Sequence, residues 1–197
     1  MIRAFIAVEL PDELRRALAA VQTRLKERVA YALNPGVKVQ WVRPESLHLT
    51  LKFLGDIEEA QVPVIGEALE RVARAQRAFV VDAVGAGVFP EIRAPRILWV
   101  GFTGTTDKLV QLAAAVESAL ASGGFPSENK PFAPHLTVAR IKEGQRDLGR
   151  ALASGKFLEL VTQVGTLPVR SIALMRSELN PSGSVYTRLH EAALKEA

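Results

Sequence analysis

The sequence His48-Leu49-Thr50-Leu51 returns in the second half of the chain as His135-Leu136-Thr137-Val138. Two of the three histidines of the protein open these two copies. In both copies, apolar side chains alternate with His and Thr, which is the pattern of a β-strand with one buried face. Successive side chains of a strand point to opposite faces, so each His shares a face with its own Thr. The sequence therefore predicts an imidazole and a hydroxyl side by side on each of two strands.

The bulk composition is that of a globular protein. The chain has 197 residues, of which 48% are hydrophobic and 23% charged, and this is sufficient for a substantial core. It contains no cysteine, which excludes disulfides, thiolate nucleophiles and Cys-ligated zinc. The apolar segment 2–10 is short and charged residues follow it, so we expect a buried strand, not a signal peptide or a membrane span. We predict a cytoplasmic monomer that does not contact a membrane.

The net charge of +4 and the isoelectric point near 9.6 give mild support for an anionic partner such as RNA. A solvated surface with a small excess of Lys and Arg would give the same values. The charge alone leaves both interpretations open.

Composition and periodicity predict an alternation of strands and helices. We expect strands over 2–9, 37–42, 47–54, 79–89, 97–102, 135–138, 157–164, 169–179 and 184–189, and helices over 11–29, 58–76, 105–120 and 143–153. Turn signals occupy 34–36 and 180–183, and a bulge is expected near Gly85 and Gly87. A loop rich in Pro and Gly, 122–134, leads into the second His strand.

Each half of the chain contains a helix, a turn-rich link and one His-Leu-Thr strand, which suggests internal symmetry. We therefore predict an α+β fold that is bilobal, with two mainly antiparallel sheets related by a pseudo-twofold axis. Helices should pack outside, and an active-site cleft should lie between the sheets. Residues 1–197 are expected to form a single two-lobed domain.

Two histidines are suited to paired acid–base chemistry near neutral pH, because one can accept a proton while the other donates one. Cleavage of a phosphodiester requires both acts, together with fixed donors that stabilise the phosphoryl oxygens. Thr50 and Thr137 would supply hydroxyl donors beside His48 and His135. This pattern favours a phosphate held between the two strands.

Other readings of the same residues are weaker. A single His-x-Thr is usually a polar part of a half-exposed sheet, but here the motif occurs twice, which favours a functional role. Neither copy is His-x-His or contains a carboxylate, and zinc requires at least three protein ligands, so we predict no metal and no cofactor. His190 could be a third ligand but is expected to be a surface or core-edge residue. The segments Gly149–Lys156, Gly85–Gly87 and Pro181–Ser184 do not complete a phosphate loop, a dinucleotide site or a nucleophile elbow.

Three longer segments carry a family resemblance: the strand Arg3–Val8, the run Trp41–Gly55 and the run Pro131–Arg140. With them the chain resembles the two-histidine phosphoesterases, and within these the RNA 2′,3′-cyclic phosphodiesterases, also called 2′-5′ RNA ligases. The resemblance implies a bilobal fold and metal-independent hydrolysis of an RNA 2′,3′-cyclic phosphate to a 2′-phosphate. It implies RNA with cyclic ends, or small cyclic nucleotides, as the partner.

The resemblance also implies roles for individual residues. His48 would be the general acid that protonates the leaving 3′-oxygen, and His135 the general base that activates water. Thr50 and Thr137 would bind the phosphoryl oxygens, and Arg140 matches a basic residue near the phosphate. Strand alternation, however, puts Arg140 on the face opposite His135 unless the strand ends or bulges there.

Further points stay open at the level of sequence. Phe53 and Phe132 could stack on a base, although core packing is the expected role of both. The same acid and base could also join a 2′,3′-cyclic phosphate end to a 5′-hydroxyl end. A third possibility is a non-catalytic protein that only binds RNA ends.

Overall fold

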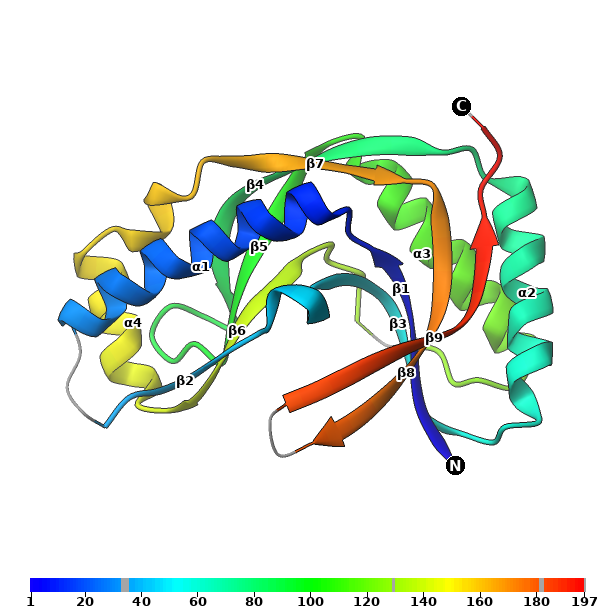
Figure 1. Cartoon of the computed structure of the whole chain (residues 1–197), viewed down its shortest axis with the longest axis horizontal. Helices are drawn as coiled ribbons and strands as arrows, with labels where there is room; N and C mark the ends of the chain where they lie inside the picture. The colour runs from blue at the N-terminus through cyan, green and yellow to red at the C-terminus, as the bar shows by residue number, and fades with distance from the viewer. Residues whose placement is uncertain (33–35, 129, 181–182, 197) are drawn as a thin grey trace.

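The computed structural model describes residues 1–32, 36–128, 130–180 and 183–196, and they form two antiparallel sheets (Figure 1). The first sheet has the strand order β3-β1-β8-β9, made by β1 (Ile2–Glu9), β3 (His48–Ile57), β8 (Ser171–Asn180) and β9 (Gly183–Ala193). The second sheet has the order β2-β6-β5-β4-β7, made by β2 (Lys38–Trp41), β4 (Phe79–Phe89), β5 (Ile97–Gly104), β6 (Leu136–Glu143) and β7 (Gln163–Val169). The two His-Leu-Thr copies therefore belong to different sheets.

Four α-helices in the described part of the chain accompany the sheets. They are α1 (Asp12–Ala32), α2 (Gln61–Ala75), α3 (Thr106–Ala121) and α4 (Gln145–Ser154), and two short 3₁₀ helices are η1 (Pro44–Ser46) and η2 (Phe157–Leu160). Figure 1 shows α2 and α3 beside the first sheet and α1 and α4 beside the second. The predicted α+β class, with two antiparallel sheets and flanking helices, is confirmed.

The two sheets are interleaved along the chain. Residues 2–9, 48–57, 171–180 and 183–193 supply the first sheet, whereas residues 38–41, 79–89, 97–104, 136–143 and 163–169 supply the second. Neither sheet therefore corresponds to one half of the chain. The reason is that α1 and β2, which connect β1 to β3, pack with the second sheet, so the chain crosses between the sheets.

The alternation of side chains along β1 gives the first sheet two different buried faces. Ile2, Ala4, Ile6 and Val8 belong to the main core, which also includes buried residues of the second sheet. On the opposite face, a smaller cluster is formed by Phe5, Ala7, Ala173 and Met175, with Tyr186 packed against it. This second face also carries His48, whose ring contacts Phe5 and Tyr186.

Most predicted elements are present with ends shifted by a few residues, and one is wrong. Residues 157–160 form η2, and the strand expected there begins only at Gln163. Lys156 adopts a left-handed conformation with φ 50°, which breaks the extended path before Phe157. The bulge expected near Gly85 is confirmed, because the register of β4 and β5 shifts there and Gly85 has φ 65°. Of the predicted turns, residues 34–35 and 181–182 lie outside the described residues.

Candidate active site

Each motif histidine is fixed by the same hydrogen bond to the backbone. Nδ1 of His48 lies 2.8 Å from the carbonyl oxygen of Ser46, and Nδ1 of His135 lies 2.7 Å from that of Ala133. A carbonyl oxygen only accepts, so Nδ1 must carry the proton in both rings. In the neutral form, Nε2 of each ring is then the nitrogen that is free to accept a proton.

Aromatic side chains hold the planes of the two imidazoles. The ring of His48 lies 4.7 Å from that of Phe5 and 5.0 Å, edge to face, from that of Tyr186. The ring of His135 lies 5.0 Å, edge to face, from that of Phe89, which in turn packs against Trp99 at 5.2 Å. Contacts of this geometry favour one orientation of each imidazole.

The two motif strands also share a bulge at the same place. In the pairing of β3 with β1, Thr50 is opposite Ala7 and Lys52 is opposite Ile6, so Leu51 is an extra residue. In the pairing of β6 with β5, Thr137 is opposite Trp99 and Ala139 is opposite Leu98, so Val138 is an extra residue. In each strand the extra residue follows the motif Thr directly, and a bulge of one residue exchanges the two faces beyond it.

The bulges decide which later side chains share a face with the histidines. Leu51 and Lys52 are both buried, as are Val138 and Ala139, so the alternation is broken at both sites. Phe53 and Arg140, each five residues after a motif His, therefore return to the face of His48 and His135, respectively. The two positions are equivalent in the two strands, and both side chains are exposed.

This geometry answers two questions that the sequence left open. Arg140 lies on the face of His135 and Thr137, because the strand does bulge between them. Phe53 is 60% exposed, so the expectation that it packs in the core is wrong. Phe132 is partly buried against the main core, as expected. His190 is also structural, with its ring against Gly66 and its Nε2 3.3 Å from Oε1 of Glu70.

His48 and Arg140 come close together although they lie on different sheets. The pKa of His48 is lowered to about 4, chiefly by burial and also by the positive charges of Arg140 and Arg15, against the raising effect of the bond to Ser46. Such an effect requires proximity, so the face of β6 that carries Arg140 is directed toward His48. In the unliganded protein His48 is neutral at pH 7.

A buried glutamine of α1 supports the second motif strand. Nε2 of Gln22 donates to the carbonyl oxygens of Val42, at 2.7 Å, and Val138, at 2.8 Å. Val138 is the bulged residue, and its carbonyl oxygen also accepts from the backbone N–H of Val42 at 3.0 Å. Gln22 is only 2% exposed, so it satisfies polar backbone atoms in a part of the core that water does not reach.

Each motif is anchored to a distant segment of the chain. The hydroxyl of Ser46 donates to the carbonyl oxygen of Ser184 on β9 at 3.3 Å, which ties the residue that binds His48 to the β8–β9 hairpin. Lys52, 1% exposed, donates to Oε1 and Oε2 of Glu117 at 2.7 and 2.8 Å, and to the carbonyl oxygen of Pro126 at 2.8 Å. Pro126 belongs to the loop that leads to His135, so β3 holds the approach to the second motif.

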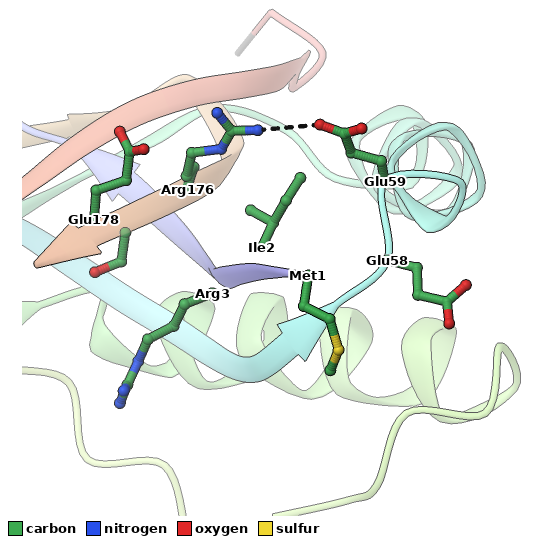
Figure 2. Close-up of a pocket in the computed structure, with 8 residues that line it drawn as sticks. Met1, Ile2, Arg3, Glu58, Glu59, Arg176 and Glu178 are labelled. Atoms are coloured by element: carbon green, nitrogen blue, oxygen red, sulfur yellow. Dashed lines mark hydrogen bonds and ion pairs between the residues drawn. The ribbon is translucent and has the colours of Figure 1, made fainter.

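The structure also contains a cavity of about 480 Å³ that none of the predicted site residues lines. It surrounds the start of β1 and is lined by Met1, Ile2, Arg3, Glu58, Glu59, Arg176, Ser177 and Glu178 (Figure 2). Two arginines and three glutamates mix there, with Arg176 paired to Glu59 at 3.5 Å. Among the described residues no group of three or more His, Asp or Glu could hold a metal ion. The helices described in the structure include none that is long and apolar enough to cross a membrane.

The chain matches the family model of the LigT-like phosphoesterases over residues 8–99 and 102–186. It belongs to this family, which confirms the resemblance seen in the motifs.

Individual relatives agree with this assignment over nearly the whole chain. An RNA 2′,3′-cyclic phosphodiesterase of Methanothermobacter thermautotrophicus is 35% identical over 191 residues, covering 94% of this chain and 95% of the relative. One from Aeropyrum pernix is 37% identical over 168 residues, covering 85% and 92%. Among solved structures, TT0787 of Thermus thermophilus has a TM-score of 0.77 at 31% identity, and E. coli LigT complexed with 3′-AMP has 0.70 at 27%. Each covers 98% of both chains.

Proposed function

We propose that the protein hydrolyses RNA 2′,3′-cyclic phosphodiester ends to 2′-phosphomonoesters, with His48 and His135 as acid and base and without a metal ion. The observation that carries the proposal is the duplicated device. Both histidines have Nδ1 bound to a carbonyl two residues earlier, a Thr on the same face, and a bulge directly after that Thr. The names of the relatives give the same substrate class.

In the proposed reaction, a water molecule attacks phosphorus while its proton passes to Nε2 of His135. The bond between phosphorus and the 3′-oxygen breaks, and the 3′-oxygen takes a proton from Nε2 of His48. The 2′-oxygen stays bonded to phosphorus, so the product carries a 2′-phosphate and a free 3′-hydroxyl. General acid and general base catalysis each contribute roughly 10²- to 10⁴-fold to such a reaction.

Thr50, Thr137 and Arg140 would bind the non-bridging oxygens of the phosphate. Two hydroxyl donors and one guanidinium stabilise the negative charge that these oxygens gain as water attacks. Phe53, exposed on the face of His48, would offer its ring to the terminal base. All of these residues belong to one chain, so a monomer would be sufficient.

The low pKa of His48 adds a condition to its role as the acid. Burial first, and the charges of Arg140 and Arg15 second, keep the ring neutral in the unliganded protein. A bound phosphate anion would offset the arginine charges and raise the pKa, so that His48 takes up a proton as the substrate binds. We therefore expect phosphate or 2′-AMP to bind at pH 7 with uptake of a proton, measurable by calorimetry in buffers of different ionisation enthalpy.

The proposal is tested by incubating the protein with RNA that ends in a 2′,3′-cyclic phosphate, in the presence of EDTA. We expect a 2′-phosphate end to accumulate. A 3′-phosphate end would contradict the assigned bond cleavage, and an unchanged cyclic end would favour a protein that binds RNA ends without turnover. An RNA with a 5′-hydroxyl end, added to the same mixture, would reveal the joining reaction.

The assignment of acid and base is tested separately with a substrate whose 3′-oxygen is replaced by sulfur. A thiolate leaves without protonation, so a variant that lacks only the acid should cleave this substrate nearly as well as the unaltered protein does. We expect this rescue for His48→Ala and not for His135→Ala. The opposite result would exchange the two roles.

A further inference from the structure

Helix α1 has two polar side chains, Arg15 and Gln22, on the side that carries its contact with the second motif strand. Nε2 of Gln22 on this helix donates to the carbonyl oxygen of Val42, in the segment before the first motif, and to that of Val138, the last residue of the second motif. Arg15 precedes Gln22 by seven residues, or two turns, so the two side chains leave the same side of the helix about 10 Å apart. Helix α1 packs against η1, the 3₁₀ turn that ends two residues before His48.

The guanidinium of Arg15 is poorly paired for a group so close to the core. Its Nε is buried and has no hydrogen-bond partner among the described residues. An ion pair joins its Nη1 to Asp12 at 3.5 Å, and the side chain of Asp12 is 81% exposed. The side chain of Arg15 is only 26% exposed. A buried polar atom without a partner costs free energy, so its presence calls for a functional explanation.

Several charged or titratable groups face His48. They are Arg15 from α1, Arg140 from β6, Tyr186 from β9, and Glu9 from β1, which is opposite His48 in register and is paired with Arg188 at 3.0 Å. Because the carboxylate of Glu9 is ion-paired with Arg188, the positive charges of Arg15 and Arg140 dominate the electrostatic environment of the imidazole. Their positive charges both lower the pKa of His48, after burial, which is the largest cause.

We propose that Arg15 is a second cation of the phosphate site, a positioning residue that attracts and holds the anion by its charge from the side of α1, opposite Arg140. The inference rests on the proposed function, since it concerns the same phosphate. Phosphate would thus lie between one arginine from a helix of the second sheet and one from β6. Because Arg15 is paired only with the exposed carboxylate of Asp12 among the described contacts, most of its charge is available to such an anion.

The test compares Arg15→Met with Arg16→Met, which removes an exposed charge from the next position of α1. Binding of inorganic phosphate and titration of His48 are followed by NMR, neither of which depends on turnover. For Arg15→Met we expect a loss of about 5- to 10-fold in phosphate affinity, and a rise in the pKa of His48. Arg16→Met should change neither quantity, and Arg15→Lys should keep most of the affinity.

A second variant leaves Arg15 itself in place. Asp12→Asn removes the exposed carboxylate that partly neutralises Arg15, so phosphate should bind more tightly, by about twofold. The inference is overturned if Arg15→Met binds phosphate within twofold of the unaltered protein, or if Asp12→Asn weakens binding. Failure of the proposed function would look different, because phosphate would still bind as described while cyclic RNA ends remained uncleaved.

Discussion

Arg140 on β6 lies close enough to His48 on β3 for its charge to add to burial in lowering the pKa of that imidazole. The two residues are far apart in sequence and belong to different sheets, so this electrostatic effect depends on how the sheets are joined. Gln22 and the backbone of Val42 hold the bulge at Val138 that turns Arg140 to this side. The pKa of His48 is thus set partly by Arg140, which lies on the strand of the second motif.

The first prediction concerns stability in acid. The pKa of His48 is lowered from an ordinary 6.5 to about 4, so below pH 6.5 the unfolded chain binds a proton that the folded protein rejects. The free energy of unfolding should therefore fall as the pH falls from 6.5 to 4, by about 3 kcal/mol from this group. Urea titrations across this range should show a weaker pH dependence for His48→Gln. The control His135→Gln, which retains His48, should keep it.

The second prediction concerns Arg140. In Arg140→Met the phosphate loses a charge-assisted hydrogen bond of about 1.5–3 kcal/mol, so the affinity for 2′-AMP should fall roughly 10- to 100-fold. Arg150→Met is the matched control, since Arg150 is exposed on α4 and paired only with Asp147 among the contacts described. Equal affinity of the two variants for 2′-AMP would mean that Arg140 does not bind the phosphate.

The third prediction concerns Gln22. Gln22→Met removes both side-chain hydrogen bonds and leaves the partly buried carbonyl oxygen of Val42 without this donor. We expect a loss of about 1–3 kcal/mol in the free energy of unfolding. Because the bulge at Val138 aims Arg140, phosphate affinity should fall as well. Thr23→Ala, an exposed change one residue along α1, should leave both quantities nearly unaltered. An unchanged phosphate affinity in Gln22→Met would show that the bulge at Val138 does not position Arg140 for phosphate binding.

The fourth prediction concerns the buried ion pair of Lys52 and Glu117. Lys52→Met removes three hydrogen bonds and leaves a partly buried carboxylate, at a cost of about 3 kcal/mol in unfolding free energy. The loop that carries Pro126 should become more mobile, and amide hydrogen exchange should increase in residues 122–128 and 130–134. Lys38→Met breaks an exposed pair with Glu143 and should cost under about 1 kcal/mol. Unchanged exchange in this loop would show that Lys52 does not hold it.

Much of the fold could be predicted from hydrophobic alternation and turn residues. The strand Ile2–Glu9 and the strand Phe79–Phe89 agree with the structure, because the first is a nearly continuous apolar run buried on both faces and the second alternates over its first residues. The strand predicted over residues 157–164 is wrong in its first half, because Leu158 and Leu160 alternate with Glu159 as in a strand, yet Phe157–Leu160 forms a 3₁₀ turn after the left-handed Lys156. The order in which the chain visits the two sheets depends on long-range packing of α1 and β2, which no local pattern records.

The candidate site shows the same division. The repeated His-Leu-Thr motif was sufficient to identify His48, Thr50, His135 and Thr137. The bulges after Thr50 and Thr137 could not, since neither Leu51 nor Val138 is a glycine or another residue that signals a bulge. The positions of Phe53 and Arg140 follow from these bulges. Arg15 and Gln22 were missed because their helix is distant in sequence, although polar residues on its buried side were visible in principle.

The most direct measurement is the steady-state hydrolysis of one RNA with a 2′,3′-cyclic phosphate end, in EDTA, by the unaltered protein, His48→Ala and His135→Ala. Each variant should first give the NMR spectrum of a folded protein. We expect each single substitution to lower kcat/KM by roughly 10²- to 10⁴-fold, because each removes one of the two proton transfers. Activity within tenfold of the unaltered protein in either folded variant would contradict catalysis by the two histidines.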